Sequence, residues 1–126
     1  AANGAVISKV GTSMLALAAH EARVRVFVVG GTYKLSVETI FGELVDIPMA
    51  EPSALVSDEV LKMIGEGLTV EAPILDVTPP EYIDAIVTER GLVAPQAVPL
   101  LVKEVYGSWP PKIPSLLELL DELEAI

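Results

Sequence analysis

The stretch TSMLALAAHEARVRVFVVGG, which spans residues 12–31, decides what kind of fold this sequence can form. Residues 12–22 place apolar side chains around most of a helical surface, so we predict a helix that is buried on more than one side. Residues 24–29 are mainly β-branched and aromatic and end at Gly30-Gly31, which is typical of a buried strand in a parallel sheet. A helix, a short turn and such a strand together predict an α/β layer fold.

The middle of the chain predicts short elements. Residues 41–47 read as an extended segment, and residues 68–70 and 74–77 read as two short apolar strands. Ser57 is a candidate cap for a helix over residues 58–64, which the glycines that follow would end.

The sequence TPPE at residues 78–81 has the features of a helix start. The threonine can cap, the first proline suits the first helical position, and the glutamate completes a capping box. We therefore predict a helix from this point to Gly91. A further helix is predicted over residues 96–106.

The C-terminal part of the chain differs in composition from the rest. Residues 107–114 contain three prolines and predict a rigid connector. Ser115 is a candidate cap for a last, amphipathic helix with acidic side chains on one face. The opposite face is a leucine stripe, which needs a partner surface on this domain or on another chain. The leucine stripe comprises Leu116, Leu119, Leu120 and Leu123.

Composition excludes several classes of function. Lysine and arginine total 8 against 18 for aspartate and glutamate, and the basic residues are scattered, which disfavours direct binding of nucleic acid or an anionic membrane. The chain has no cysteine, so disulfides, thiol catalysis and cysteine-based zinc sites are excluded. The single histidine, His20, has no nearby ligand pattern, so we predict neither a metal site nor a cofactor.

The hydropathy of the chain is high. Hydrophobic residues make up 52% of it and the mean hydropathy is +0.55, which predicts a large core or an apolar face for a partner chain. No apolar run reaches the roughly 20 residues that span a bilayer. We therefore expect a soluble, cytoplasmic protein.

Two segments place a lysine where a ligand could bind. In residues 3–12, NGAVISKVGT, glycines and Lys9 precede a helix whose free N–H groups attract anions. The alternative is that Thr12 merely caps the helix and the lysine is solvated. In residues 30–34, GGTYK, Lys34 follows a strand end, where ligands of open parallel sheets bind, although an ordinary turn is an alternative.

A carboxylate marks a third candidate. Asp76 stands at a predicted strand end and could serve as a general acid or base. The alternative is structural, because Asp76 could bond nearby backbone N–H groups and the capping box already explains Thr78 and Glu81.

These segments also resemble a known family. Residues 3–12 resemble its Asn-Gly-x-Val-x-Asn-Lys-x-Gly-Thr signature, and residues 32–36 its Thr-Tyr/Phe-Lys-Phe-Ser turn. Residues 76–91, DVTPPEYIDAIVTERG, are close to its most recognisable block. The similarity covers about residues 2–107. The family that the chain resembles contains the alpha, beta and delta subunits of translation initiation factor 2B and their sugar-phosphate isomerase relatives. With Gly-Glu-Leu-Val at residues 42–45, the chain looks nearest to archaeal ribose-1,5-bisphosphate isomerases and the factor subunits.

The resemblance implies a fold and a missing part. It implies a Rossmann-like layered domain over residues 1–108, with a mostly parallel sheet flanked by helices, followed by the connector and helix at residues 109–126. In the family's isomerases, a cysteine and an aspartate convert an aldose phosphate to a ketose phosphate, and the aspartate lies in a Gly-Ala-Asp motif just before the Asn-Gly block. Neither catalytic residue is in this chain, so we expect a fragment of a longer protein.

The resemblance also implies substrate-binding residues. Ser8 and Lys9 match the family's Asn-Lys pair, and Lys34 matches the lysine of the Thr-Tyr-Lys turn. Ser8 replaces the usual asparagine, which keeps a hydrogen-bonding group but shortens its reach. We expect a phosphorylated sugar to bind these residues, with the helix that starts near Thr12 adding its N-terminal dipole.

Three hypotheses follow for function. The first is the C-terminal, substrate-binding domain of an archaeal-type aldose–ketose isomerase acting on a ribose phosphate such as ribose 1,5-bisphosphate, in a homo-oligomer. The second is a non-catalytic regulatory subunit of the initiation factor 2B type that acts by subunit assembly. The third is a small interaction domain that dimerises through the leucine stripe.

Overall fold

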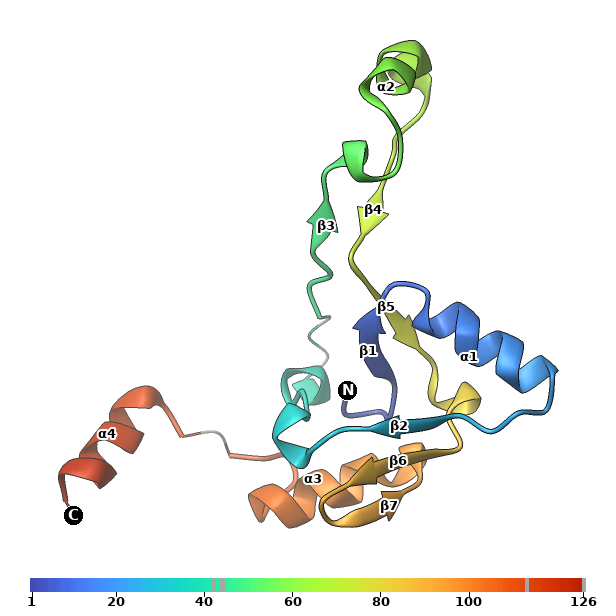
Figure 1. The fold of residues 1–126 in the computed structure, drawn as a ribbon. Helices are drawn as coiled ribbons and strands as arrows, with labels where there is room; N and C mark the ends of the chain where they lie inside the picture. Colours follow the sequence, from blue (N-terminus) through green and yellow to red (C-terminus); the bar gives the residue numbers. More distant parts are fainter. Residues whose placement is uncertain (42, 44, 113, 126) are drawn as a thin grey trace.

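The computed structural model describes residues 1–41, 43, 45–112 and 114–125 (Figure 1). Helices and short strands alternate along this part of the chain, which is therefore mixed α/β, as predicted. Its helices are α1 (Thr12–Glu21), α2 (Asp58–Ile64), α3 (Val98–Tyr106) and α4 (Leu116–Glu124). Its strands are β1 (Val6–Lys9), β2 (Phe27–Val29), β3 (Met49–Ala50), β4 (Ala72–Pro73), β5 (Leu75–Thr78), β6 (Ala85–Thr88) and β7 (Gly91–Val93).

The described strands form three small sheets. β1 pairs with β5 and β3 with β4, both antiparallel. The third sheet has the order β2-β6-β7, in which β2–β6 is parallel and β6–β7 is an antiparallel hairpin. The expectation of a mostly parallel sheet is therefore wrong for the described strands. A two-residue turn joins β6 to β7, and so short a connection permits only antiparallel pairing.

The predicted helix at residues 12–22 is confirmed as α1, but its burial is not. α1 packs against β5 and the turn Pro80–Tyr82, and the rings of His20 and Tyr82 lie 5.2 Å apart between centroids. Ala16 is the buried residue of α1, whereas Met14 and Leu15 are more than 70% exposed. α1 is covered on one side only.

The predicted strand at residues 24–29 is confirmed in part. β2 is shorter, covers Phe27–Val29 and pairs in parallel with β6, as the sequence pattern indicated. Phe27 and Val29 are each more than half exposed, so the prediction of a buried strand is wrong for this chain. One face of the three-stranded sheet is open.

The helix predicted from TPPE to Gly91 is wrong. A single 3-10 turn, Pro80–Tyr82, is followed by β6 and β7. Thr78 makes no capping bond, and Pro79 and Ile83 on either side of the turn have extended backbone angles. The β-branched residues that follow favour a strand once β2 is available as a partner.

The three remaining predicted helices are present in the structure. α2 is confirmed, with the Ser57 hydroxyl accepting the Val60 N–H at 3.4 Å. α3 is confirmed, and it begins after the 3-10 turn Pro95–Ala97. α4 is confirmed with a complete capping box at its start.

Two predictions for the middle of the chain need correction. Residues 68–70 do not form the predicted strand, and the strand in this region, β4, lies further along the chain at Ala72–Pro73. The strand predicted at residues 74–77 is confirmed as β5. The extended segment predicted at residues 41–47 includes residues 42 and 44, which lie outside the described residues. Phe41 itself ends a 3-10 turn.

The core is small and lies beside α3. Val37, Val98 and Val102 are buried together, and Leu35, Ile40 and Ile86 pack against them. This cluster joins α3 to β6 and to the segment that follows β2. Figure 1 shows α3 running beside β6 and β7, while β3, β4 and α2 form an arm that extends away from the sheets. Along the described ranges, every helix is too short or too polar to cross a bilayer.

Candidate functional site

A cavity of about 270 Å³ lies where β1, the end of β2 and α3 meet. The backbone of Gly30 and Gly31 forms part of its wall, and Val98 and Leu101 of α3 form another part. Ser8, Thr32 and further polar residues interrupt an otherwise apolar lining. The further polar residues of the lining are Lys34, Ser36 and Thr88.

The structure brings together two of the three expected substrate-binding residues. Ser8 on β1 and Lys34 after β2 both line the cavity. Lys9 does not line it and is exposed at the end of β1. Lys34 ends the 3-10 turn Thr32–Lys34, and its Nζ lies 5.9 Å from the centroid of the Tyr33 ring, a distance at which a cation attracts an aromatic face.

The Asn-Gly pair before β1 forms a tight turn. The Asn3 Oδ1 atom accepts the Ala5 N–H at 3.0 Å. Gly4 has φ +86°, and a Cβ atom placed there would lie 2.1 Å from the carbonyl oxygen of Pro95. The Asn-Gly part of the first block therefore sets how β1 sits against the segment that starts α3.

The N-terminus of α1 binds a carboxylate of the chain itself. The Oδ2 atom of Asp76 accepts the Gly11 N–H at 2.8 Å, the Ser13 N–H at 3.1 Å and the Ser13 hydroxyl at 2.8 Å. Thr12 does not cap the helix, because its hydroxyl donates to the carbonyl oxygen of Lys9. In the described chain, Asp76 therefore takes up the donors of Gly11 and Ser13 at this helix end, and the structural interpretation of Asp76 is confirmed.

The electrostatics of Asp76 agree with this capping role. Burial raises the pKa of Asp76, but the hydrogen bonds from Ser13 and Gly11 outweigh burial and lower the pKa below its ordinary value. A carboxylate held ionised by three donors is a poor general acid. Asp76 thus holds α1 against β5.

A second carboxylate of the same block joins β2 to β6. The Oδ2 atom of Asp84 accepts the Val26 N–H at 2.7 Å, and the Asp84 N–H donates to the Val26 carbonyl oxygen at 2.9 Å. These two bonds precede the first strand pair, Phe27 with Ala85. Asp84 therefore sets the register of the parallel pair.

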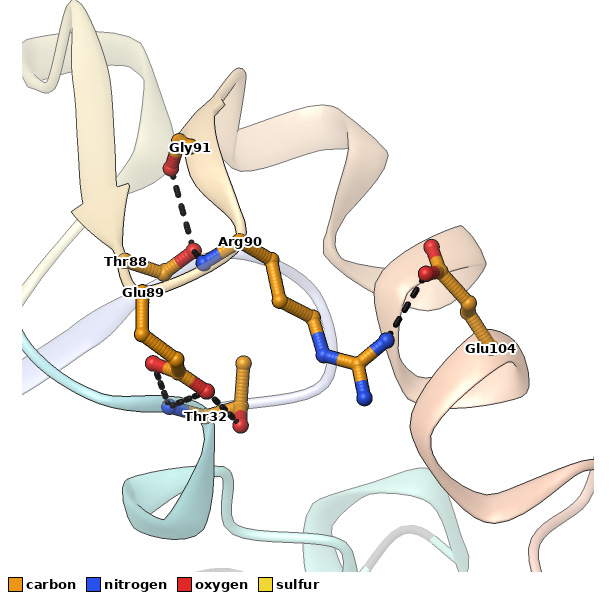
Figure 2. Close-up of polar contacts among 6 residues, drawn as sticks. All are labelled: Thr32, Thr88, Glu89, Arg90, Gly91 and Glu104. Carbon is orange, nitrogen blue, oxygen red and sulfur yellow. Dashed lines mark hydrogen bonds and ion pairs between the residues drawn. The ribbon is translucent and has the colours of Figure 1, made fainter.

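A third carboxylate, that of Glu89, holds the turn that carries Lys34. The Thr32 N–H lies 3.0 Å from Oε2 and 3.3 Å from Oε1 of Glu89, and the Thr32 hydroxyl also donates to Glu89 (Figure 2). Hydrogen bonds from the Thr32 hydroxyl and N–H, and then the nearby Arg90 charge, lower the pKa of Glu89. Glu89 is therefore ionised at neutral pH.

Sequence reasoning missed Asp84 and Glu89. Both lie directly beside the four-residue strand β6, one before it and one after it. A lone carboxylate at each end of so short a strand is a signal that could have indicated backbone contacts to neighbouring strands. Three acidic side chains of residues 76–91 thus bind backbone N–H groups that are distant in the sequence.

The site holds no cluster suited to a metal. Within the ranges that the structure describes, no three His, Asp or Glu side chains gather closely enough to bind an ion. The cavity instead offers hydroxyl groups, backbone groups and one ammonium, which suit an oxygen-rich, anionic organic ligand.

Comparison with known proteins places the chain in a family. Residues 1–95 match the sequence profile of the Initiation factor 2 subunit family. The ribose 1,5-bisphosphate isomerase of Thermococcus kodakarensis is 44% identical over 105 residues, which are 83% of this chain and 33% of that protein.

Solved structures show the same relationship. The 5-methylthioribose 1-phosphate isomerase of Pyrococcus horikoshii OT3 superposes with a TM-score of 0.57 at 31% identity, over 82% of this chain and 30% of that one. The Pyrococcus horikoshii OT3 translation initiation factor eIF-2B gives a TM-score of 0.53 at 31% identity, over 74% of this chain and 30% of that one.

The coverage of these matches is unequal. The chain spans about a third of the length of the curated relatives that it matches, whereas those relatives cover more than four fifths of the chain. The family profile covers most of the chain and includes β1, Lys34 and all of residues 76–91. This chain therefore belongs to the Initiation factor 2 subunit family.

Proposed function

We propose that the protein containing this chain is an aldose–ketose isomerase that acts on a ribose phosphate, with ribose 1,5-bisphosphate as the first substrate to test. The chain would be its C-terminal, Rossmann-like, substrate-binding domain. The observation that carries this proposal is the 44% identity to a protein named ribose 1,5-bisphosphate isomerase. Layering of the small sheets into one Rossmann-like sheet is part of the proposal.

The cavity supplies the binding chemistry that the proposal needs. The Lys34 ammonium would pair with a phosphate or with sugar oxygens, and the Ser8 hydroxyl would hydrogen-bond a sugar hydroxyl. The glycines at the end of β2 let the backbone come close to the ligand. Lys9 is a further proposed binding residue, and its exposed ammonium at the end of β1 would be free to pair with a second phosphate.

Catalysis would come from outside this chain. An aldose–ketose isomerisation moves protons within one substrate, so it needs acid–base groups and no redox cofactor. The chain has no cysteine, and we propose that the catalytic cysteine and aspartate stand elsewhere in the longer protein. A cytoplasmic homo-oligomer is the assembly that we propose.

Lysine substitutions in the full-length protein test the site. We expect Lys34→Ala to lower kcat/KM for ribose 1,5-bisphosphate about tenfold or more, since one charge-assisted contact to the substrate is lost. Ser8→Ala and Lys9→Ala should give smaller losses. Lys103→Ala is the matched control, because Lys103 is an exposed lysine of α3 that does not line the cavity. Equal kcat/KM for Lys34→Ala and Lys103→Ala would remove Lys34 from the site.

The likeness to initiation factor eIF-2B at 31% identity favours a second candidate, a regulatory subunit that acts by assembly. The two candidates differ in the rest of the reading frame. A cysteine and a Gly-Ala-Asp motif upstream support the isomerase, whereas their absence together with stable binding to other factor subunits supports the regulatory role.

A further inference from the structure

The turn that carries Lys34 has few supports of its own. Thr32–Lys34 is a single 3-10 turn, closed by the Lys34 N–H to the Gly31 carbonyl oxygen at 3.0 Å and the Leu35 N–H to the Thr32 carbonyl oxygen at 3.1 Å. The residue before the turn, Gly31, has no side chain with which to cap it. Thr32 is 9% exposed and Tyr33 is 82% exposed, so the turn is anchored at its first residue and open beyond it.

The anchor comes from the β6–β7 hairpin. The Glu89 carboxylate accepts hydrogen bonds from both the N–H and the hydroxyl of Thr32, which lies 57 positions earlier in the sequence. Because one carboxylate takes both donors of the same residue, it restricts rotation of the turn as well as its distance from the hairpin. Hydrogen bonds to a charged acceptor are among the stronger ones in proteins.

The hairpin itself is held on both sides of Glu89. The Thr88 hydroxyl accepts the Arg90 N–H at 3.1 Å and donates to the Gly91 carbonyl oxygen at 3.0 Å. The Arg90 guanidinium pairs with Glu104 of α3 at 2.7 Å, as Figure 2 shows. Glu89 is therefore presented by a turn that is held on both sides, whereas among the described residues the side-chain hydrogen bonds to the Thr32–Lys34 turn come from Glu89.

We propose that Glu89 is a positioning residue, which fixes Thr32 and thereby places the Lys34 ammonium at the cavity. This proposal rests on the proposed role of Lys34 in substrate binding. Glu89 does not line the cavity, so it acts through the turn and not through contact with the ligand. Its removal should weaken substrate binding and leave the chemical step, which belongs to other residues, nearly unchanged.

The link between Glu89 and the turn can be tested without substrate. In the full-length protein, we expect Glu89→Ala to speed hydrogen exchange at the amides of the Thr32–Lys34 turn about tenfold, because the turn then opens more often. Glu89→Gln keeps one acceptor oxygen and should give a smaller increase. Glu66→Ala, an exposed glutamate in the arm, is the matched control and should change nothing at the turn. Unchanged exchange in Glu89→Ala would overturn the proposal.

The positioning role is tested by a double-mutant cycle with substrate. We expect Glu89→Ala to raise KM about tenfold with kcat within about twofold, since misplacement of a binding group acts mainly on binding. In a Lys34→Ala background, the same substitution should raise KM no further. An equal rise in both backgrounds would show that Glu89 acts on something other than Lys34 and would overturn the proposal.

The cycle separates this inference from the proposed function. If Lys34→Ala alone leaves KM unchanged, the proposed binding site is wrong, and the positioning role is overturned with it. If Lys34→Ala raises KM but Glu89→Ala does not, the site stands and the positioning role alone is wrong.

Discussion

At the scale of single residues, Gly4 is a position that has no room for a side chain. Its φ of +86° is strained for other residues, and a Cβ atom would lie 2.1 Å from the Pro95 carbonyl oxygen. We expect Gly4→Ala to lower the free energy of unfolding of the full-length protein by more than about 2 kcal/mol, because backbone must shift to relieve the contact. Denaturant unfolding measures this.

The matched control for this prediction is Gly67→Ala. A Cβ atom at Gly67 meets nothing within 4 Å, and its φ lies outside the strained positive range. We expect a change within about 1 kcal/mol for that variant. Equal losses for Gly4→Ala and Gly67→Ala would contradict the tight contact with Pro95.

Glu89 gives the residue-scale prediction for pH. Its hydrogen bonds with Thr32 and the Arg90 charge lower its pKa below the ordinary glutamate value. A depressed folded-state pKa means that the link is fully formed above the unfolded-state value and is lost as the pH falls through the folded-state value. The Thr32 amide resonance should therefore stay constant on acidification until the pH is below the ordinary glutamate range. Titration of that resonance together with the Glu89 carboxyl at an ordinary glutamate pKa would contradict the link.

At the scale of elements, α1 depends on a carboxylate from another element. Asp76 supplies the acceptors for Gly11 and Ser13 at the helix start, so we expect Asp76→Ala to lower the melting temperature of the full-length protein by about 2–4 °C. Asp76→Asn keeps an acceptor and should lower it less. Asp121→Ala, at an exposed position of α4, is the control. A melting temperature for Asp76→Ala equal to that of the control would show that the cap is dispensable.

Two segments with the same capping pattern adopt different structures. Ser115 and Glu118 form a complete capping box, in which the Ser115 N–H donates to Glu118 at 2.6 Å and α4 follows. Thr78 and Glu81 have the same spacing, yet a strand follows them. Leucines and acidic residues follow the first pair, and β-branched residues follow the second. Whether such a capping pattern starts a helix therefore depends on the residues that follow it and on whether a partner strand is available.

At the scale of the whole molecule, the chain leaves much apolar surface open. Met14 and Leu15 of α1, Val29 of β2, and Leu116 of α4 are each more than 70% exposed. A surface of this kind usually meets another chain or another part of the same protein. The high hydropathy noted in the sequence thus corresponds to exposed faces more than to a large core.

The leucine stripe provides a prediction on assembly. If it mediates self-association, deletion of residues 115–126 from the full-length protein should lower the molar mass measured by light scattering. The expected cause is loss of the apolar face of α4, whose side chains are exposed in the single chain. An unchanged mass would assign assembly to other surfaces.

How much could be predicted from the sequence depends on the range of the contacts. Helices with local signals, such as α2 after Ser57 and α4 after Ser115, were predicted correctly because their caps lie within four residues. The resemblance named Ser8, Lys9 and Lys34, of which Ser8 and Lys34 line one cavity and Lys9 does not. The links from Asp84 and Glu89 join segments more than 50 positions apart, and no local pattern encodes such a partner.

Turnover of ribose 1,5-bisphosphate by the full-length protein, measured by NMR of the sugar carbons, tests the proposed isomerase site most directly. Wild-type protein and Lys34→Ala should be compared side by side at equal concentration. We predict conversion to the ketose bisphosphate by the wild type and conversion slowed about tenfold or more by Lys34→Ala. No conversion by the correctly folded wild type, or equal rates for the two proteins, would contradict the proposed isomerase site.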